Sequence, residues 1–270
     1  MVRTAVPNAP GTIHWNPLTG EIDRAALEGL DAVIHLAGEN VGAGRWTTQR
    51  RAAIRASRVD GTKLLTTTLA GLDEPPRTLV CASAIGFYGD RGTEELDEAS
   101  EPGRGFLPEL CQAWEDAGSG SSEAGIRVVN VRIGVVLAAH GGALSRMVGP
   151  FRLGLGGVVG SGHQYVSWIS LADVVRALEH CLMSESLAGP VNAVAPEPAT
   201  NRELTRTLGR VLRRPTLFPL PAFAVRAAFG EMGKELLLAS ARVQATRLLA
   251  DGFEFRHASL DSALRDALGK

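Results

Sequence analysis

Short apolar runs rich in β-branched residues alternate along the chain with segments of helical pattern, and this alternation constrains the fold most. Strands are expected at 32–37 (AVIHLA), 78–84 (TLVCASA), 127–137 (RVVNVRIGVVL) and 190–195 (PVNAVA). Helices are expected over 46–70 and 106–117. Runs that are apolar throughout indicate strands buried on both faces, as in parallel sheets covered by helices. The pattern predicts an α/β fold with a doubly wound parallel sheet.

The later part of the chain contains two helix-start signals and a glycine-rich stretch. Ser170-x-x-Asp173 and Thr200-x-x-Glu203 have the spacing of capping boxes, in which the acidic side chain reaches back to the first backbone N–H, so each predicts a helix start. The stretch 141–162 holds eight glycines in 22 residues and is typical of a helix followed by an open loop. We expect a smaller, mostly helical second part to begin here.

The balance of charges excludes several classes of protein. The 270 residues include 28 Lys and Arg against 29 Asp and Glu, for a net charge of -1, which argues against a nucleic-acid partner. Cys81, Cys111 and Cys181 lie far apart and outside any C-x-x-C spacing, so neither disulfides nor a metal site are expected. No signal peptide and no apolar run of 18 residues is present, which predicts a cytoplasmic protein without a membrane partner.

The scarcity of tyrosine and lysine excludes one kind of catalytic residue pair. The chain has only two tyrosines, Tyr88 and Tyr165, and only three lysines. The residues four positions after the tyrosines are Gly92 and Ile169. A Tyr-x-x-x-Lys pair is therefore absent.

Three strand ends carry the residues that suggest chemistry. VIHLAGEN (33–40) and CASAIGFYGD (81–90) both run from apolar strands into small residues, which let a ligand approach the backbone. In 127–137 a charge, Arg132, interrupts an apolar strand. A buried charge needs a partner, so Arg132 either forms a salt bridge or faces the cleft.

Together these motifs resemble the extended branch of the short-chain dehydrogenase/reductase superfamily, and in particular its atypical group labelled "epimerase family protein". The resemblance also covers SRVDGT (57–62), GFLPELCQAWE (105–115), PFRLGLGGVVGSGHQYVSWI (150–169), GPVNAVAPEPATN (189–201) and FGEM (229–232). It therefore spans almost the whole chain. It implies a Rossmann-type sheet with a nucleotide cofactor at its carboxyl edge, a cofactor part over 1–140 and a substrate-binding part over 141–270. Residues 163–200 would return a helix and a strand to the sheet.

Carried over residue by residue, the resemblance also implies a cofactor site. The residues that would contact the cofactor are Arg3, Leu36, Ala37, Gly38, Arg58, Ser83, Arg132 and Val136. Arg3 falls where the second strand of the fold would end, and a guanidinium there suits the 2′-phosphate of NADP. A solvated N-terminal arginine is the alternative. We expect NADP, with NADPH preferred, while NAD stays open.

Two departures from the superfamily pattern are evident. The usual N-terminal strand, glycine-rich turn and helix have no counterpart, so we expect the sheet to lack its first strand and helix. The catalytic Tyr and Lys positions fall at Leu107 and Cys111, and the Ser position falls at Ala84, beside Ser83. Proton transfer by the superfamily's usual route is therefore excluded.

Other residues would have to replace the missing groups. Tyr88 and Ser83 are the hydroxyls expected nearest the sheet edge and are the candidate catalytic residues, while the alternative for both is a structural role. His163, Gln164 and Trp168 are expected in the substrate pocket.

The residues and the resemblance together predict an NADP(H)-dependent oxidoreductase, or a protein similar to a nucleotide-sugar epimerase, that acts on a small molecule. The alternatives are a non-catalytic NADP(H)-binding sensor and a chain that binds no dinucleotide. A homodimer is left open.

Overall fold

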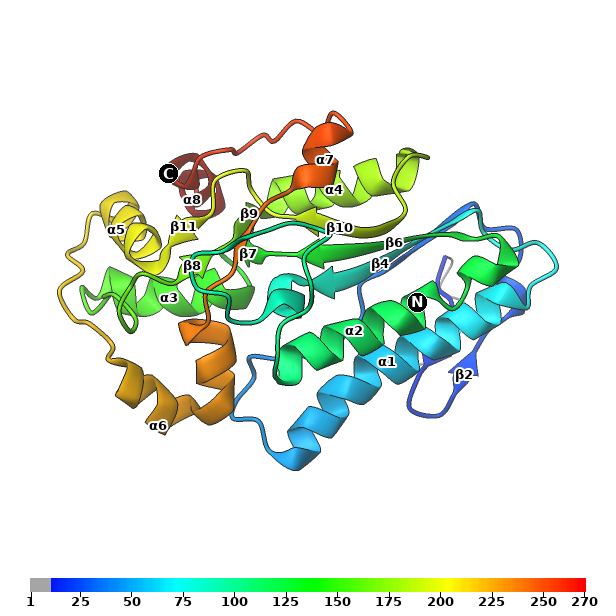
Figure 1. Cartoon of the computed structure of the whole chain (residues 1–270), viewed down its shortest axis with the longest axis horizontal. Helices are drawn as coiled ribbons and strands as arrows, with labels where there is room; N and C mark the ends of the chain where they lie inside the picture. The colour runs from blue at the N-terminus through cyan, green and yellow to red at the C-terminus, as the bar shows by residue number, and fades with distance from the viewer. Residues whose placement is uncertain (1–10) are drawn as a thin grey trace.

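The computed structural model describes residues 11–270, and its centre is a parallel sheet (Figure 1). The strands lie side by side in the order β10 (Gly189–Ala193), β6 (Arg127–Ile133), β4 (Thr78–Ala84) and β3 (Ala32–His35). All three pairings between them are parallel. The α/β class with a Rossmann-type parallel sheet is confirmed.

Helices cover both faces of this sheet. The helices α1 (Thr48–Ala70) and α2 (Phe106–Ser119) lie side by side on one face, and α4 (Leu171–Met183) covers the other (Figure 1). Successive side chains alternate between the faces, because a strand has a period of two. Leu79 packs with α1, whereas Val80 packs in the cluster that includes residues of α4. This two-sided burial explains the continuously apolar strand sequences.

The expected strand over 127–137 is in fact two strands. Its first part is β6, and β7 (Val135–Leu137) pairs instead with β9 (Trp168–Ser170). Gly134 separates them, and a Cβ there would lie 2.8 Å from the Ser167 carbonyl oxygen and 2.9 Å from a Val194 methyl. The glycine lets the chain leave the main sheet where it meets the second part of the molecule.

Helices of the second part surround their own core. These helices are α3 (Gly142–Arg152), α5 (Asn201–Leu212) and α8 (Leu260–Leu268). Their cluster includes Leu144, Trp168, Leu208 and Leu264. Both α4 and β10 come from the 163–200 stretch and complete the main sheet. The division of the chain at residue 140 stays a prediction.

The two expected capping boxes differ. Thr200 and Glu203 form a complete box at the start of α5. Ser170 accepts a hydrogen bond from the Asp173 N–H, but the Asp173 carboxylate does not reach back to the backbone of Ser170. It is fully buried and accepts from the N–H groups of Arg256 (2.7 Å) and His257 (3.0 Å). Asp173 therefore holds the C-terminal segment against α4.

Shorter elements complete the molecule. The strands are β1 (Trp15–Asn16) with β2 (Glu21–Ile22), β5 (Glu95–Leu96) with β12 (Arg242–Val243), and β8 (Tyr165–Val166) with β11 (Ala199–Thr200). The helices are η1 (Ala25–Leu27), η2 (Ile85–Tyr88), η3 (Ser122–Ala124), α6 (Ala222–Gly233), the π-helix η4 (Lys234–Leu238) and α7 (Thr246–Ala250). Across residues 11–270, no helix is long and apolar enough to cross a membrane.

Candidate functional site

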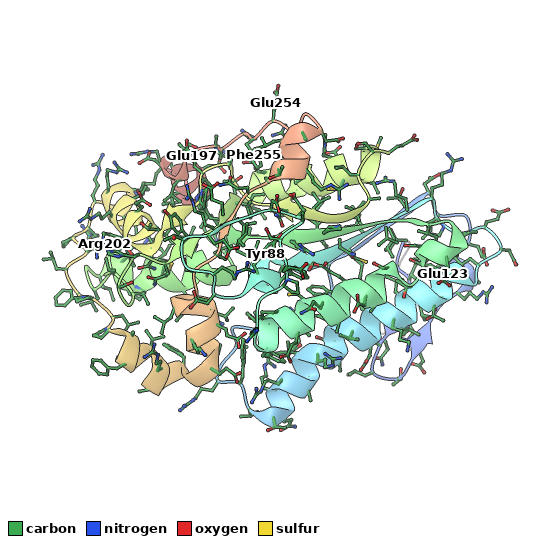
Figure 2. The ribbon with its side chains drawn as sticks, viewed as in Figure 1. Tyr88, Glu123, Glu197, Arg202, Glu254 and Phe255 are labelled. Atoms are coloured by element: carbon green, nitrogen blue, oxygen red, sulfur yellow. The ribbon has the colours of Figure 1, made fainter. Side chains whose placement is uncertain are left out.

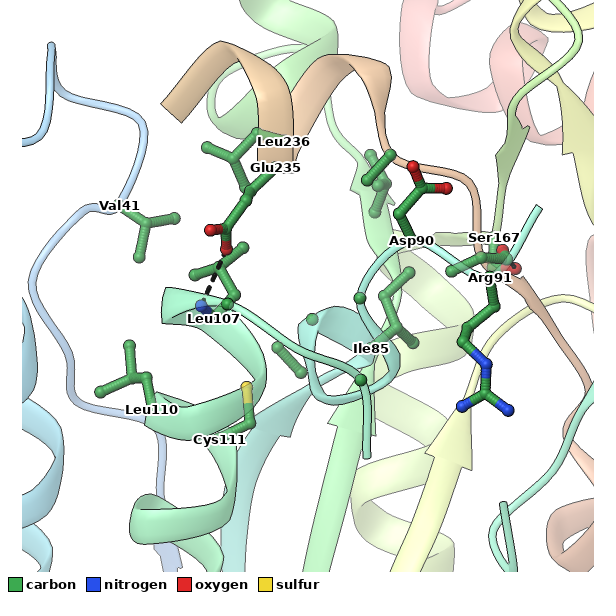
Figure 3. A pocket seen from close by; sticks show the side chains of 18 of the residues that line it. Val41, Ile85, Asp90, Arg91, Leu107, Leu110, Cys111, Ser167, Glu235 and Leu236 are labelled. Atoms are coloured by element: carbon green, nitrogen blue, oxygen red, sulfur yellow. Dashed lines mark hydrogen bonds between the residues drawn. The ribbon is translucent and has the colours of Figure 1, made fainter. Parts of the chain in front are cut away.

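A pocket of about 750 Å³ lies beyond the carboxyl ends of β4 and β6. Open α/β sheets bind ligands at this edge. The sheet supplies small and apolar groups from 84–86 and 133–135, and α2 supplies one wall (Figure 3). The opposite wall comes from η4 and the end of α6. The pocket thus joins the first and last parts of the chain.

The N-terminus of α2 forms part of this pocket. Its N-cap residue Gly105 has no side chain to cap the free N–H groups. The carboxylate of Glu235 on η4 accepts from the N–H of Phe106 (3.1 Å) and of Leu107 (2.8 Å; Figure 3). A helix N-terminus carries partial positive charge, so the carboxylate is stabilised there. This contact fixes η4 as a wall of the pocket.

Arg58 on α1 brings a cation to the pocket lining. Its Nη1 donates to the Glu39 carbonyl oxygen at 2.9 Å, and its guanidinium lies 4.9 Å from the Trp114 ring centroid. Partial burial lowers the pKa of Arg58 from its usual value, yet an arginine keeps its charge. Neither Nε nor Nη2 has a hydrogen-bond partner within residues 11–270. The pocket therefore offers donors to an anion.

The two positions on α2 where the superfamily carries its catalytic Tyr and Lys line the pocket in this chain. Leu107 and Cys111 face it from α2, with Leu110 and Trp114 beside them. Burial, and secondarily the neighbouring Glu115, raises the pKa of the Cys111 thiol to about 12. This wall is apolar and carries no group that titrates near neutral pH.

Ser83 and Arg132 do not line the pocket. They are paired neighbours on β4 and β6, and both point toward α2. Glu115 on α2 lies 2.9 Å from both Nε and Nη2 of Arg132 and accepts from the Ser83 hydroxyl at 2.6 Å. All three groups are buried or nearly so. Of the two alternatives for Arg132, the structure shows the salt bridge. The pocket is lined by the neighbouring residues Ala84 and Ile133.

Tyr88 lies at the centre of the molecule (Figure 2), fully buried and outside the pocket lining. Its hydroxyl accepts from Arg132 Nη1 at 3.0 Å and lies 2.7 Å from Asn192 Oδ1 and 2.9 Å from the Asp97 carbonyl oxygen. Burial raises the pKa of Tyr88 to about 12, although Arg132 opposes this rise. These contacts tie η2 to β6 and β10 and fit the structural role that the sequence left open for Tyr88.

The remaining expected cofactor residues that the structure describes do not themselves line the pocket. Leu36, Ala37 and Gly38 follow β3 at the carboxyl edge, and the Gly38 backbone approaches the Arg58 guanidinium closely. Val136 is half-buried against the core, while its neighbour Val135 lines the pocket. Arg3 lies outside the described residues.

The three expected substrate residues have other surroundings. Trp168 is fully buried in the core of the second part, where its Nε1 donates to the Glu197 carbonyl oxygen. Gln164 is buried, and its Nε2 donates to the carbonyls of Val159 (2.9 Å) and Leu237 (3.1 Å). His163 is exposed and does not line the pocket. The pocket instead takes the consecutive residues Tyr165, Val166 and Ser167 from this stretch.

Sequence reasoning missed several lining groups. Tyr165 and Ser167 carry the only hydroxyl side chains of the described lining. Ser167 Oγ donates to the Ala241 carbonyl oxygen and accepts from the Val243 N–H, whereas the Tyr165 hydroxyl has no hydrogen bond within residues 11–270. Both lie in the 163–168 stretch from which substrate residues were expected, so the sequence indicated the segment but not these residues. Glu235 lies 128 residues from Leu107, and no sequence signal connects the two.

Residues 12–193, more than half of the chain, match the NAD dependent epimerase/dehydratase family. The chain belongs to this family. Residues 220–267 match a second family, described as Domain of unknown function (DUF1731), and this stretch supplies the η4 wall of the pocket. The expected resemblance is confirmed.

Relatives from distant organisms match nearly the whole chain. Epimerase family protein Mb2239 from Mycobacterium bovis is 44% identical over 264 residues, covering 98% of this chain and 87% of the relative. Epimerase family protein SDR39U1 from Homo sapiens is 37% identical over 260 residues, covering 95% of this chain and 87% of the relative.

A solved structure extends the similarity to three dimensions. The crystal structure of the human epimerase family protein SDR39U1 (isoform 2) with NADPH superposes with a TM-score of 0.89 at 36% identity. The match covers 99% of this chain and 89% of the human one. Both the main sheet and the second part of this chain therefore have counterparts in that protein.

Proposed function

We propose that this chain binds NADPH in the sheet-edge pocket and reduces a small carbonyl compound there. The observation that carries the proposal is the pocket itself, at the carboxyl ends of β4 and β6, with the free donors of Arg58 on its lining. The similarity to the human protein crystallised with NADPH supports the choice of cofactor.

The lining fits a nicotinamide nucleotide. Gly86 lets η2 pack closely against the α2 wall, since a Cβ there would lie 3.3 Å from the Leu107 Cβ. Leu107, Leu110 and Ile133 form apolar walls that suit the nicotinamide ring. The guanidinium of Arg58 suits a phosphate or a ribose hydroxyl. Leu36, Ala37 and Gly38 would take the more distant ribose and diphosphate.

When bound, NADPH supplies a hydride to the carbonyl carbon, and a proton on the oxygen completes the alcohol and leaves NADP⁺. The hydroxyl of Tyr165 is the lining group best suited to give that proton, because no residue of the described chain (11–270) forms a hydrogen bond with it. The apolar α2 wall excludes water from the carbonyl. Ser83 and Arg132 act indirectly, by holding α2 against the sheet through Glu115.

The second candidate is a non-catalytic NADP(H) sensor. One observation favours it: Leu107 and Cys111 stand on the lining where the superfamily carries its proton-transfer pair. In such a protein the cofactor would act by fixing η4 and α6 around the pocket. A reaction on nucleotide sugars, the Arg3 contact with a 2′-phosphate, a cytoplasmic location and a homodimer remain predictions.

Consumption of NADPH with a panel of aldehydes and ketones separates the two candidates. We expect turnover with at least one carbonyl class, a kcat reduced at least tenfold in Tyr165→Phe, and an unchanged Kd for NADPH in that variant. Binding of NADPH without turnover on any member of a broad panel would favour the sensor. Equal kcat in Tyr165→Phe would remove this residue from the mechanism.

A further inference from the structure

Two cationic side chains on the pocket lining have no partner among residues 11–270. They are Arg104, two residues before the start of α2, and Lys234, the first residue of η4. Both are exposed at the pocket, and within the described chain neither forms a hydrogen bond or an ion pair. Cations that line a cavity without a counterion attract an anionic group of a ligand.

The backbone brings Arg104 and Lys234 to the same wall of the pocket. Arg104 adjoins Gly105, and Lys234 adjoins Glu235. A Cβ at Gly105 would lie 2.9 Å from Oε1 of Glu235, so the two segments of chain touch here. Each cation therefore starts one residue away from a single contact, a step of about 3.8 Å between Cα atoms. Both side chains are long, so their charged ends can meet at one small anion.

The turn that carries Arg104 is fixed on both sides. The Gly103 N–H donates to the Phe87 carbonyl oxygen at 2.9 Å, and a Cβ at Gly103 would clash with the Tyr88 carbonyl oxygen. Gly105 has a φ of 121°, in the region that favours glycine. The turn thus packs closely on η2 and η4, and Arg104 is held at the pocket between them.

The acidic side chains of the described lining leave the two cations without a counterion. Glu231 forms an ion pair with Arg51 at 2.9 Å. Asp90 accepts from the Ser240 N–H at 3.1 Å and lies apart from Glu235 in the pocket (Figure 3). The Glu235 carboxylate accepts from the first N–H groups of α2. A ligand is therefore left to supply the missing negative charge.

The balance of charge at this wall favours a carboxylate. Arg104, Lys234 and Glu235 together leave a single positive charge, because two cations stand beside one carboxylate. One carboxylate on a ligand balances that charge, whereas a phosphate monoester carries roughly two negative charges at pH 7. The Arg104 guanidinium can donate two parallel N–H groups to a carboxylate, and the Lys234 ammonium can add another donor.

We propose that the carbonyl substrate of the pocket carries a carboxylate, which Arg104 and Lys234 bind, so that the chain reduces an oxo acid. This inference rests on the proposed function. The reaction is the one given above: hydride to the carbonyl carbon, a proton to its oxygen, and NADPH oxidised to NADP⁺. The carboxylate is not altered and only positions the substrate, while Arg58 on α1 is left for the cofactor.

The test compares short straight-chain aldehydes that end in a carboxylate with their methyl esters and with a short aldehyde phosphate. We expect kcat/KM to be about ten- to a hundredfold higher for the acid than for the ester, because the ester loses a charged hydrogen bond. The advantage should lie in KM and should shrink as the ionic strength rises.

Variants of the two cations test their part in this preference. In Arg104→Met and Lys234→Met the ratio of acid to ester should fall toward one, whereas Lys234→Arg should keep it. Arg226→Met is the matched control and should also keep it. Arg226 is exposed on α6 and outside the lining, so its loss removes the same charge elsewhere.

A second readout does not require turnover. Calorimetric titration of the NADPH complex should show hexanoate binding at least about tenfold more tightly than hexanamide. This difference should disappear in Arg104→Met and Lys234→Met.

The outcomes separate the inference from the proposed function. If NADPH binds and neutral aldehydes are reduced, but neither the acid nor hexanoate is preferred, the inference is wrong and the proposed function stands. If NADPH does not bind, the proposed function fails first. A preference for the aldehyde phosphate, or loss of NADPH binding in Arg104→Met and Lys234→Met, would show that the cations serve another anion and would overturn the inference.

Discussion

Tyr88 and Tyr165, the two tyrosines, have opposite surroundings. The Tyr88 hydroxyl is buried among Arg132, Asn192 and the Asp97 carbonyl, whereas the Tyr165 side chain lines the pocket and its hydroxyl has no hydrogen bond to any residue from 11 to 270. A buried hydroxyl that serves such a network contributes to stability, and removing it leaves its partners unsatisfied. Removal of the Tyr88 hydroxyl is therefore expected to lower stability, whereas removal of the Tyr165 hydroxyl is expected to lower turnover.

We expect Tyr88→Phe to lower the free energy of unfolding by about 1–3 kcal/mol. Activity per folded molecule should be unchanged, because Tyr88 does not contact the pocket. Chemical denaturation and steady-state kinetics measure the two effects, and Tyr165→Phe is the reciprocal control, with stability kept and turnover lost. A Tyr88→Phe protein that folds normally and is inactive would contradict the structural role.

His35 makes stability depend on pH. It is buried beside Trp15, with its Nε2 3.0 Å from the Thr62 hydroxyl, and burial lowers its pKa to about 4. The unfolded chain takes up a proton near pH 6.5, but the folded one resists it. The part of the folding stability that depends on a neutral His35 is thus fully present above about pH 6.5 and is lost as the pH falls toward 4.

Denaturation measured between pH 7 and pH 4 should show the free energy of unfolding falling by about 3 kcal/mol as the pH is lowered. In His35→Gln this part of the pH dependence should disappear. His163→Gln, which changes an exposed histidine, should keep the wild-type slope. Parallel pH profiles for wild type and His35→Gln would show that another group is responsible.

The alternation of side chains along a strand explains why some residues expected at the site do not line the pocket. Ser83 and Arg132 were expected at the cofactor, but their neighbours Ala84 and Ile133 are the residues that line the pocket. The sequence locates the strands of the main sheet, although it joins β6 to β7, but it does not show which face of a strand lies against which helix. It showed that a buried Arg132 needs a partner without identifying Glu115. The contact from Glu235 to Leu107 could not have been predicted either, because only tertiary packing brings these residues together.

At the scale of elements, the carboxylate of Glu235 is the link between α2 and η4. It caps the α2 N-terminus in place of Gly105, which has no side chain. The cap also fixes the pocket wall that η4 forms. Loss of this contact should therefore affect both the helix end and the wall.

We expect Glu235→Ala to cost about 1 kcal/mol of stability, the usual value of an N-terminal cap. The amides of Phe106 and Leu107 should lose protection in hydrogen exchange. Glu123→Ala is the control, because this exposed side chain makes no hydrogen bond or ion pair with residues 11–270. Unchanged exchange at 106–107 would mean that α2 is capped in another way.

At the scale of the whole molecule, the sequence alone predicted the parallel sheet, its strand positions and its carboxyl-edge site. Apolar strand runs determine these features locally. The pocket itself needed the structure, because its second wall comes from 231–241, far from the sheet in sequence. The function proposed for the chain therefore depends on whether this assembled pocket holds a nucleotide.

The most direct measurement is a fluorescence titration of NADPH into wild type, Arg58→Gln and Arg55→Gln at fixed ionic strength. Arg55 lies on the same helix, exposed and outside the pocket, so its loss removes the same net charge. We predict saturable binding that Arg58→Gln weakens ten- to a hundredfold, as expected for a lost charged hydrogen bond, and that Arg55→Gln changes less than twofold. No binding by the wild-type protein, or equal affinities for the two variants, would contradict the account.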